Sequence, residues 1–207
     1  MPRLTREESR ALTRQKLLAA AAKVFAEQGF GGSSIDRIVD EAGFSKGAFY
    51  SNFASKEEIF LQLVEGAALH TEHELEAKLL GLDDPEAIVE AVSEWATINS
   101  QEADRRALIL DLVRHARRDA ALTKRHTELF TANWISVGTL IQKIFPNGKA
   151  PATPLEIGAM VMELTFGTAM HFHGGPTAGD LVRLALRGLM ASANEMQAQK
   201  KKTIPLS

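Results

Sequence analysis

Residues 29–60 read GFGGSSIDRIVDEAGFSKGAFYSNFASKEEIF, and this stretch decides the fold. Ser33, followed three residues later by Asp36, is a capping-box pattern that predicts the start of a short helix. Gly43 predicts its end, because glycine adopts the left-handed conformation of a helix cap without a steric clash. Ser45 can cap a second short helix directly after that turn. Two short helices joined by a tight turn are the plan of a helix-turn-helix.

The segments on either side of this stretch are also predicted to be helical. Residues 6–28 carry apolar side chains at helical spacing, and Gly29 predicts the end of their helix. Ser55 with Glu58 is a second capping-box pattern, which opens a long helix over about residues 56–80. The second short helix of the helix-turn-helix is too short to be stable alone, so it must pack on its neighbours.

The remainder of the chain is predicted to be helical as well, because no stretch alternates apolar and polar residues as a strand does. We therefore predict an all-α fold, in which a three-helix head is followed by a domain of about six helices. The expected parts are the head at residues 1–55, the helical domain at 56–198 and a disordered tail at 199–207. The further helices are expected over about residues 84–98, 102–118, 120–145, 154–172 and 177–198.

The second short helix carries a surface that is suited to DNA. Phe49 and Phe53 are its expected anchors in the core, so its opposite face is left for a ligand. Helix-turn-helix proteins place the start of this helix against base edges in the major groove. The hydroxyl of Tyr50 can reach a phosphate while its ring packs, and Lys56 begins the next helix, where anions are also favoured. The exposed face is expected to carry Lys46, Gly47, Ala48, Tyr50 and Asn52.

Charge is distributed unevenly along the chain. The 24 lysines and arginines against 26 acidic residues give a net charge of -2, which alone argues against a nucleic-acid partner. Residues 1–56 nevertheless carry a net charge of +3, whereas residues 57–207 carry -5. A basic head on an acidic body predicts that only the head approaches a polyanion.

Several classes of protein are excluded by what the sequence lacks. The absence of cysteine removes disulfides, thiol catalysis and cysteine-based zinc sites. The first ten residues are charged and unlike a secretory signal, and the apolar stretch at 157–170 is too short to span a bilayer. No hydrolase or metalloprotease motif is present, so we predict neither an enzyme nor a cofactor. We expect a cytoplasmic protein.

The combination G-F-x-x-S-S-I-x-x-I…A-G-F-S-K-G-A-F-Y-S-N-F-x-S-K-E resembles the DNA-binding domain of the TetR/AcrR family of bacterial repressors, over about residues 10–60. The resemblance implies a homodimer that binds a double-stranded DNA operator through its heads. It also implies that the helices behind the head bind a small-molecule inducer and dimerise. The expected function is therefore a ligand-responsive transcriptional regulator, a repressor released from a palindromic operator by a small, largely apolar inducer.

The family's DNA contacts can be transferred to matching positions of this chain. The resemblance implies phosphate contacts by Ser33 and Ser34, base or backbone contacts by the face of the second short helix, and a contact by Lys56. Two positions depart from the family's pattern. Asp36 replaces an arginine that some members use to read a base, and it is better explained as a helix-capping acid. Ala48 replaces a threonine or serine, which leaves a methyl contact with thymine.

Residues for the inducer pocket and the dimer interface are less sharply indicated. Apolar and aromatic residues spread over the later helices are expected to form both core and cavity. His70, with Glu74 four residues later, is better explained as part of a polar helix face than as a metal site. The pocket candidates are His70, Trp95, His115, Phe130, Trp134, Met162, Phe166 and Met170. The interface candidates, on the apolar faces of the last two helices, are Ile157, Val161, Leu164, Leu181, Leu184 and Leu189.

Two other functions are compatible with the sequence. The first is an enzyme or a metal-binding helical bundle with an incidental resemblance at its N-terminus. The second is an architectural DNA binder that has no inducer. Salt-dependent binding to a specific palindrome separates the ligand-responsive regulator from both.

Overall fold

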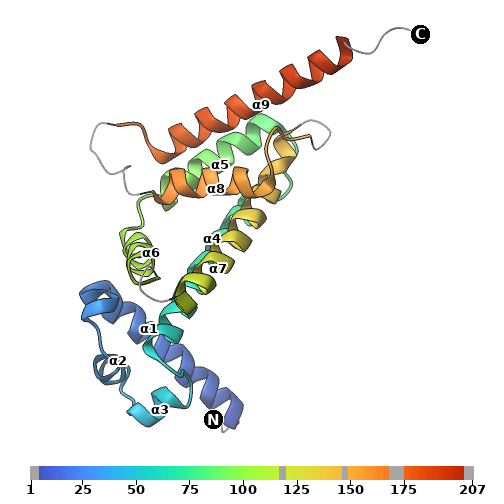
Figure 1. Ribbon diagram of the computed structural model, residues 1–207. Helices are drawn as coiled ribbons and strands as arrows, with labels where there is room; N and C mark the ends of the chain where they lie inside the picture. Colours follow the sequence, from blue (N-terminus) through green and yellow to red (C-terminus); the bar gives the residue numbers. More distant parts are fainter. Residues whose placement is uncertain (1–4, 117–119, 146–148, 168–174, 203–207) are drawn as a thin grey trace. The chain divides into compact units, whose positions relative to one another are not determined.

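The computed structural model describes residues 5–116, 120–145, 149–167 and 175–202 (Figure 1). The described residues form nine α-helices and one 3-10 helix and contain no strand, which confirms the all-α fold. None of the helices described is long and apolar enough to cross a membrane. The elements are α1 (Arg6–Gly32), α2 (Ile35–Ala42), α3 (Lys46–Tyr50), α4 (Lys56–Leu79), α5 (Pro85–Asn99), α6 (Ala103–Ala116), α7 (Ala120–Ile141), η1 (Gln142–Ile144), α8 (Pro154–Phe166) and α9 (Ala178–Lys202).

The described helices belong to two compact units. The first unit comprises the chain up to Ala68 together with Asp104–His126, and the second comprises Leu69–Ala103 and the residues from Thr127 onward. The first unit thus contains α1 to α3, the first half of α4, nearly all of α6 and the start of α7. The chain therefore adds α6 and part of α4 to the compact head, beyond the boundary expected at residue 55.

Most helix ends lie within a few residues of their predicted positions. α5 begins at Pro85, next to its expected start, and Asp84 caps it, because the Asp84 side chain accepts a hydrogen bond from the backbone N–H of Ala87. Gly29 has a φ of 68° and kinks α1, but three further helical residues follow it before the helix ends. α8 ends at Phe166 instead of near residue 172, and residues 168–174 lie outside those described. α9 continues to Lys202, so residues 199–202 are helical and not part of a disordered tail.

Several phenylalanines lie in the core of the first unit. Phe49 and Phe53 are fully buried, as their expected role as anchors of α3 requires. The guanidinium of Arg14 on α1 lies 4.2 Å from the centre of the Phe53 ring, and its Nη1 donates to the backbone oxygen of Asn52. These contacts hold the end of α3 against α1. A helix as short as α3 needs such tertiary contacts to be stable.

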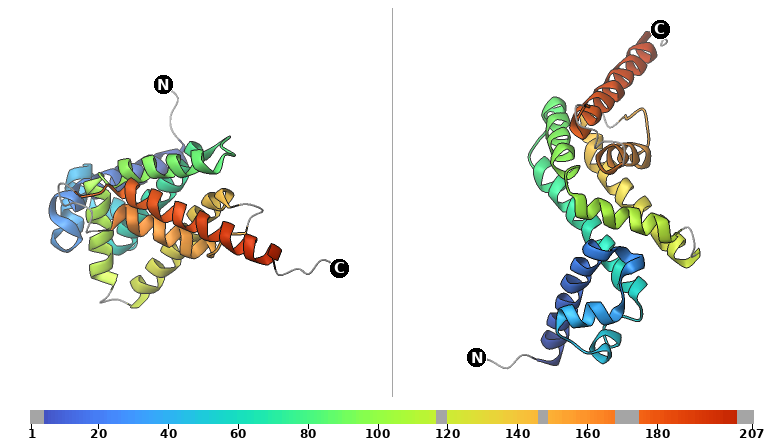
Figure 2. Two further views of the ribbon diagram at one scale, coloured as in Figure 1. Left: turned by 90° about the horizontal axis from the view of Figure 1, so that it is seen from above. Right: turned by 90° about the vertical axis from the view of Figure 1, so that its left-hand side faces the viewer.

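In the second unit, α9 lies along α5 and α8 (Figure 2). Two arginines on α9 form ion pairs with acids on α5: Arg183 Nη2 lies 2.9 Å from Glu90 Oε2, and Arg187 Nη2 lies 3.0 Å from Glu86 Oε2. The hydrogen bond from Arg183 lowers the pKa of Glu90. Because these side chains are at least partly exposed to water, the ion pairs set the register of α9 more than they stabilise the unit.

Glycines let helices of the second unit approach to backbone contact. A Cβ atom at Gly158 of α8 would lie 1.8 Å from the backbone oxygen of Trp134 on α7. A Cβ atom at Gly138 of α7 would lie 1.8 Å from the backbone oxygen of Pro154, at the start of α8. The crossing of α7 and α8 therefore depends on the missing side chains at both positions.

Candidate DNA-binding surface

The turn between α2 and α3 has the geometry that its sequence predicts. Gly43 adopts the left-handed conformation with a φ of 70°, and its backbone N–H bonds to the oxygen of Asp40. The side chain of Ser45 caps α3 by accepting a hydrogen bond of 3.2 Å from the N–H of Ala48. Both caps are set by residues close in sequence, which fixes the start of α3 relative to α2.

The exposed face of α3 presents three of the predicted residues. Lys46 and Gly47 are exposed at the start of the helix, and the Tyr50 side chain is 57% exposed while its ring packs edge-on against Phe49. Nζ of Lys46 lies 2.7 Å from Asp36 Oδ1, and this hydrogen bond raises the pKa of Lys46. Since both side chains are largely exposed, the ion pair is weak, and Lys46 can leave Asp36 and bind a phosphate instead.

The structure places Asn52 differently from the prediction. Only 8% of Asn52 is exposed, and its Nδ2 donates a hydrogen bond of 2.8 Å to the backbone oxygen of Ala48. Its amide therefore satisfies the carbonyl end of α3 and is not presented on the surface. Ala48 itself is half-buried, which leaves its methyl group only partly accessible.

The two serines before α2 have different roles. Ser34, and not Ser33, is the cap: its side chain accepts a hydrogen bond of 3.3 Å from the N–H of Arg37. Ser33 is buried, and its hydroxyl donates to the backbone oxygen of Phe30. The predicted capping box of Ser33 and Asp36 is therefore wrong. Ser34 remains exposed and available to a phosphate, whereas Ser33 does not.

Lys56 makes hydrogen bonds within the first unit and is not a free surface cation. Its Nζ donates hydrogen bonds of 2.7 Å to the backbone oxygen of Phe30 and 2.8 Å to that of Ser33. The same nitrogen lies 4.3 Å from the centre of the Phe30 ring, and burial lowers the pKa of Lys56. Two of the three ammonium protons thus hold the start of α4 to the end of α1 and to the residue that follows it.

We expect Lys56→Met to reduce stability. Methionine keeps an apolar stem over Phe30 but removes both charged hydrogen bonds, which should lower the free energy of unfolding by roughly 1–3 kcal/mol. Urea unfolding followed by circular dichroism measures this difference. Lys16→Met, at an exposed lysine of α1, is the matched control. Equal stability of the two variants would contradict the assigned role of Lys56.

α6 contacts the head at the kink in α1. Because Gly29 interrupts the helical ladder, the N–H of Phe30 is free to donate a hydrogen bond of 2.6 Å to Asp111 Oδ2 on α6. The ring of His115, one turn further along α6, meets the Phe30 ring edge-on with centroids 4.7 Å apart. His115 therefore packs in the first unit and does not join the other pocket candidates. Sequence reasoning did not identify Asp111.

Four of the pocket candidates share the core of the second unit. Trp95 and Met162 are buried there, and Trp134 and Phe166 pack against them. The rings of Trp95 and Phe166 are perpendicular, with centroids 6.3 Å apart. Phe130 meets Trp134 in the same way on α7, with centroids 6.1 Å apart.

The remaining pocket candidates lie elsewhere. His70 Nε2 lies 3.1 Å from Glu74 Oε1, and the His70 side chain is largely exposed, in keeping with a polar helix face. Within the described parts of the chain, no three histidines or acids gather as metal ligands. Met170 lies outside the described residues.

The interface candidates divide into two groups. Ile157 and Val161 are fully buried in the core of this chain's own second unit, so they are not available to a partner. Leu164, Leu181 and Leu189 are half-buried. Leu184 on α9 is 71% exposed, which is unusual for a leucine in the middle of a helix.

A segment of the first unit is similar in sequence to a known family. Residues 17–63 match the family model of bacterial regulatory proteins of the tetR family. The chain is 30% identical to the HTH-type transcriptional regulator AcrR of Shigella flexneri over 118 residues, which cover 56% of this chain and 54% of that protein. Among the first three curated relatives, the matches span 27% to 54% of the relative's length.

Solved structures resemble nearly the whole chain. A putative TetR-family transcriptional regulator from Mesorhizobium loti superposes with a TM-score of 0.71, at 19% identity, over 91% of this chain and 98% of that one. The transcriptional regulator FadR from Bacillus subtilis, solved in complex with stearoyl-CoA, superposes with a TM-score of 0.62, at 18% identity, over 86% of this chain and 97% of that one. At these identities the likeness concerns the fold.

Proposed function

We propose that this chain, which is similar to the tetR family of bacterial regulatory proteins over residues 17–63, is a dimeric, ligand-responsive repressor that binds a palindromic operator. One observation carries the proposal: the Ser45-capped helix α3 presents Lys46, Gly47 and Tyr50 on one exposed face. Glycine at the helix start allows close approach to a groove, and the cation and the phenol flank it. The relatives reported above are named regulators, which favours this function over an enzyme.

The first test is directed at the exposed face of α3. Tyr50→Phe and Lys46→Ala should each weaken binding to a palindromic operator, which can be selected from random DNA. Lys46→Ala should also reduce the slope of log affinity against log salt by about 1, because one phosphate contact is lost. If Lys46 reads a base instead, the variant should lose about 1–3 kcal/mol of discrimination at one position. Fluorescence anisotropy at several salt concentrations measures both effects.

Two further variants make this test selective. Asp36→Asn should tighten binding to all sequences, since it releases Lys46 from its ion pair and adds a net positive charge. Lys16→Met again serves as a control, because it removes a cation that lies outside the exposed face of α3. Unchanged affinity in all of the α3 variants, with folding intact, rules out this face as the DNA contact. Binding with no preference for a palindrome favours the architectural binder.

We further propose that the inducer binds among the aromatic residues of the second unit. Nε1 of Trp95 is buried and has no hydrogen-bond partner among the described residues, although only 3% of this tryptophan is exposed. A buried donor of this kind favours a ligand that brings an acceptor, such as a carbonyl oxygen, into apolar surroundings. The FadR complex with stearoyl-CoA, whose acyl chain is apolar, supports a ligand with an apolar part. Because DNA and inducer oppose each other, each should lower the affinity for the other by the same factor.

A further inference from the structure

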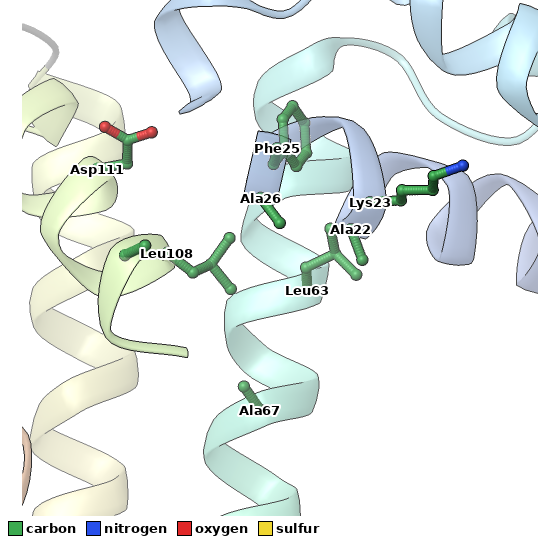
Figure 3. A pocket seen from close by; sticks show the side chains of 9 residues that line it. Ala22, Lys23, Phe25, Ala26, Leu63, Ala67, Leu108 and Asp111 are labelled. Atoms are coloured by element: carbon green, nitrogen blue, oxygen red, sulfur yellow. The ribbon is translucent and has the colours of Figure 1, made fainter. Parts of the chain in front are cut away.

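The first unit contains a cavity of about 360 Å³ between α1, α4 and α6 (Figure 3). Phe25, Leu63 and Leu108, one from each helix, form its bulky walls. Small residues such as Ala26 on α1 and Ala67 on α4 complete the lining. Alanine side chains are too short to fill the space between three helices, so the cavity remains open within a packed unit.

Two charged residues border the cavity, and only one of them can serve a ligand. The ammonium of Lys23 points away from the cavity (Figure 3) and lies 2.6 Å from Glu41 Oε1. Asp111 uses Oδ2 to accept the N–H of Phe30, while its Oδ1 has no hydrogen-bond partner among the described residues. The cavity therefore combines apolar walls with one carboxylate oxygen that is free to accept.

We propose that this cavity binds a small apolar molecule that carries one protonated amine. Its apolar part fits between Phe25, Leu63 and Leu108, and its ammonium donates to Asp111 Oδ1. The cavity volume lies in the usual range for small-molecule sites. An ammonium is preferred to a hydroxyl because the carboxylate attracts its positive charge in addition to accepting a hydrogen bond, whereas a hydroxyl offers the hydrogen bond alone. This site lies within the first unit, whereas the inducer residues proposed above belong to the second.

The probe for this site is 2-phenylethylamine, with 2-phenylethanol as its uncharged counterpart. Titration into the full ¹⁵N-labelled chain, followed by amide chemical shifts, reports both location and affinity. We expect saturable shifts at Ala26, Ala67 and Asp111, with an affinity about tenfold higher for the amine than for the alcohol. Shifts confined to the second unit, or no saturable shifts at these amides, would overturn the proposal.

Two variants test separately how the charge of Asp111 and the space of the cavity contribute to binding. Asp111→Asn keeps an oxygen for the Phe30 N–H but removes the charge, so the amine should lose about tenfold in affinity while the alcohol changes little. Ala26→Leu adds bulk to the cavity from an exposed position, so it should abolish binding of both probes. Ala11→Leu, at another exposed alanine of α1, should leave both affinities unchanged. Amine binding that survives Asp111→Asn and Ala26→Leu would refute this site.

Discussion

Gly158→Ala is expected to destabilise the second unit strongly. The new Cβ atom would lie 1.8 Å from the backbone oxygen of Trp134 and 2.9 Å from the backbone nitrogen of Gly138, and backbone atoms cannot rotate away as a side chain can. α7 and α8 must separate, which opens the core around Val137 and Val161. The cost should reach or exceed about 3 kcal/mol, at the upper end for overpacking.

Thermal unfolding measures this effect, and a loss of about 3 kcal/mol should lower Tm by roughly 6–12 °C in a protein of this size. Gly66→Ala is the matched control: it adds the same methyl group to helix α4, where no atom lies within 4 Å of the new Cβ. That variant should gain up to about 1 kcal/mol from helix propensity. Similar melting temperatures for the two variants would show that the crossing of α7 and α8 tolerates a side chain.

Leu184→Glu is expected to dissociate the proposed dimer and abolish tight operator binding. Leu184 is 71% exposed on α9, so the single chain does not need this leucine to fold. In an apolar interface with a second copy, the glutamate would be an unpaired buried charge. The two heads would then bind independently, and operator affinity should fall by about 10²–10⁴-fold as the avidity of the dimer is lost.

Sedimentation at micromolar concentration and operator anisotropy test this result together. Leu80→Glu is the matched control, because Leu80 is 82% exposed but lies directly after α4 and not on the last two helices. The control should remain a dimer with unchanged operator affinity. A monomeric wild type, or a Leu184→Glu variant that is still dimeric, would move the interface away from this part of α9.

The sequence predicted local structure well because helix caps depend on neighbouring residues. Ser45 caps its helix as predicted, since the N–H that it receives belongs to Ala48, only three residues away. The choice between Ser33 and Ser34 could not be predicted in this way. Ser33 is buried, its hydroxyl donates to the backbone oxygen of Phe30, and its own backbone oxygen accepts from Lys56. Lys56 lies 23 residues further along the sequence.

Longer-range contacts explain the other differences. The apolar faces of α8 and α9 were visible in the sequence, but periodicity does not distinguish a face that packs inside the chain from one that meets a partner. Ile157 therefore proved to be core, whereas Leu184 remained exposed. Asp111 gave no signal, because its partner is a backbone N–H 81 residues away that only the kink at Gly29 releases.

That kink makes the Phe30 amide an internal reporter. In an ordinary helix, an amide proton is protected from exchange with water by the carbonyl one turn earlier, so its exchange follows the opening of its own helix. The Phe30 proton is instead held by a carboxylate on α6. Its deuterium uptake in D₂O thus follows the separation of α6 from α1, while uptake at neighbouring positions of α1 follows local fraying. Comparing these rates would time the motion between the two helices in the intact protein, without any label.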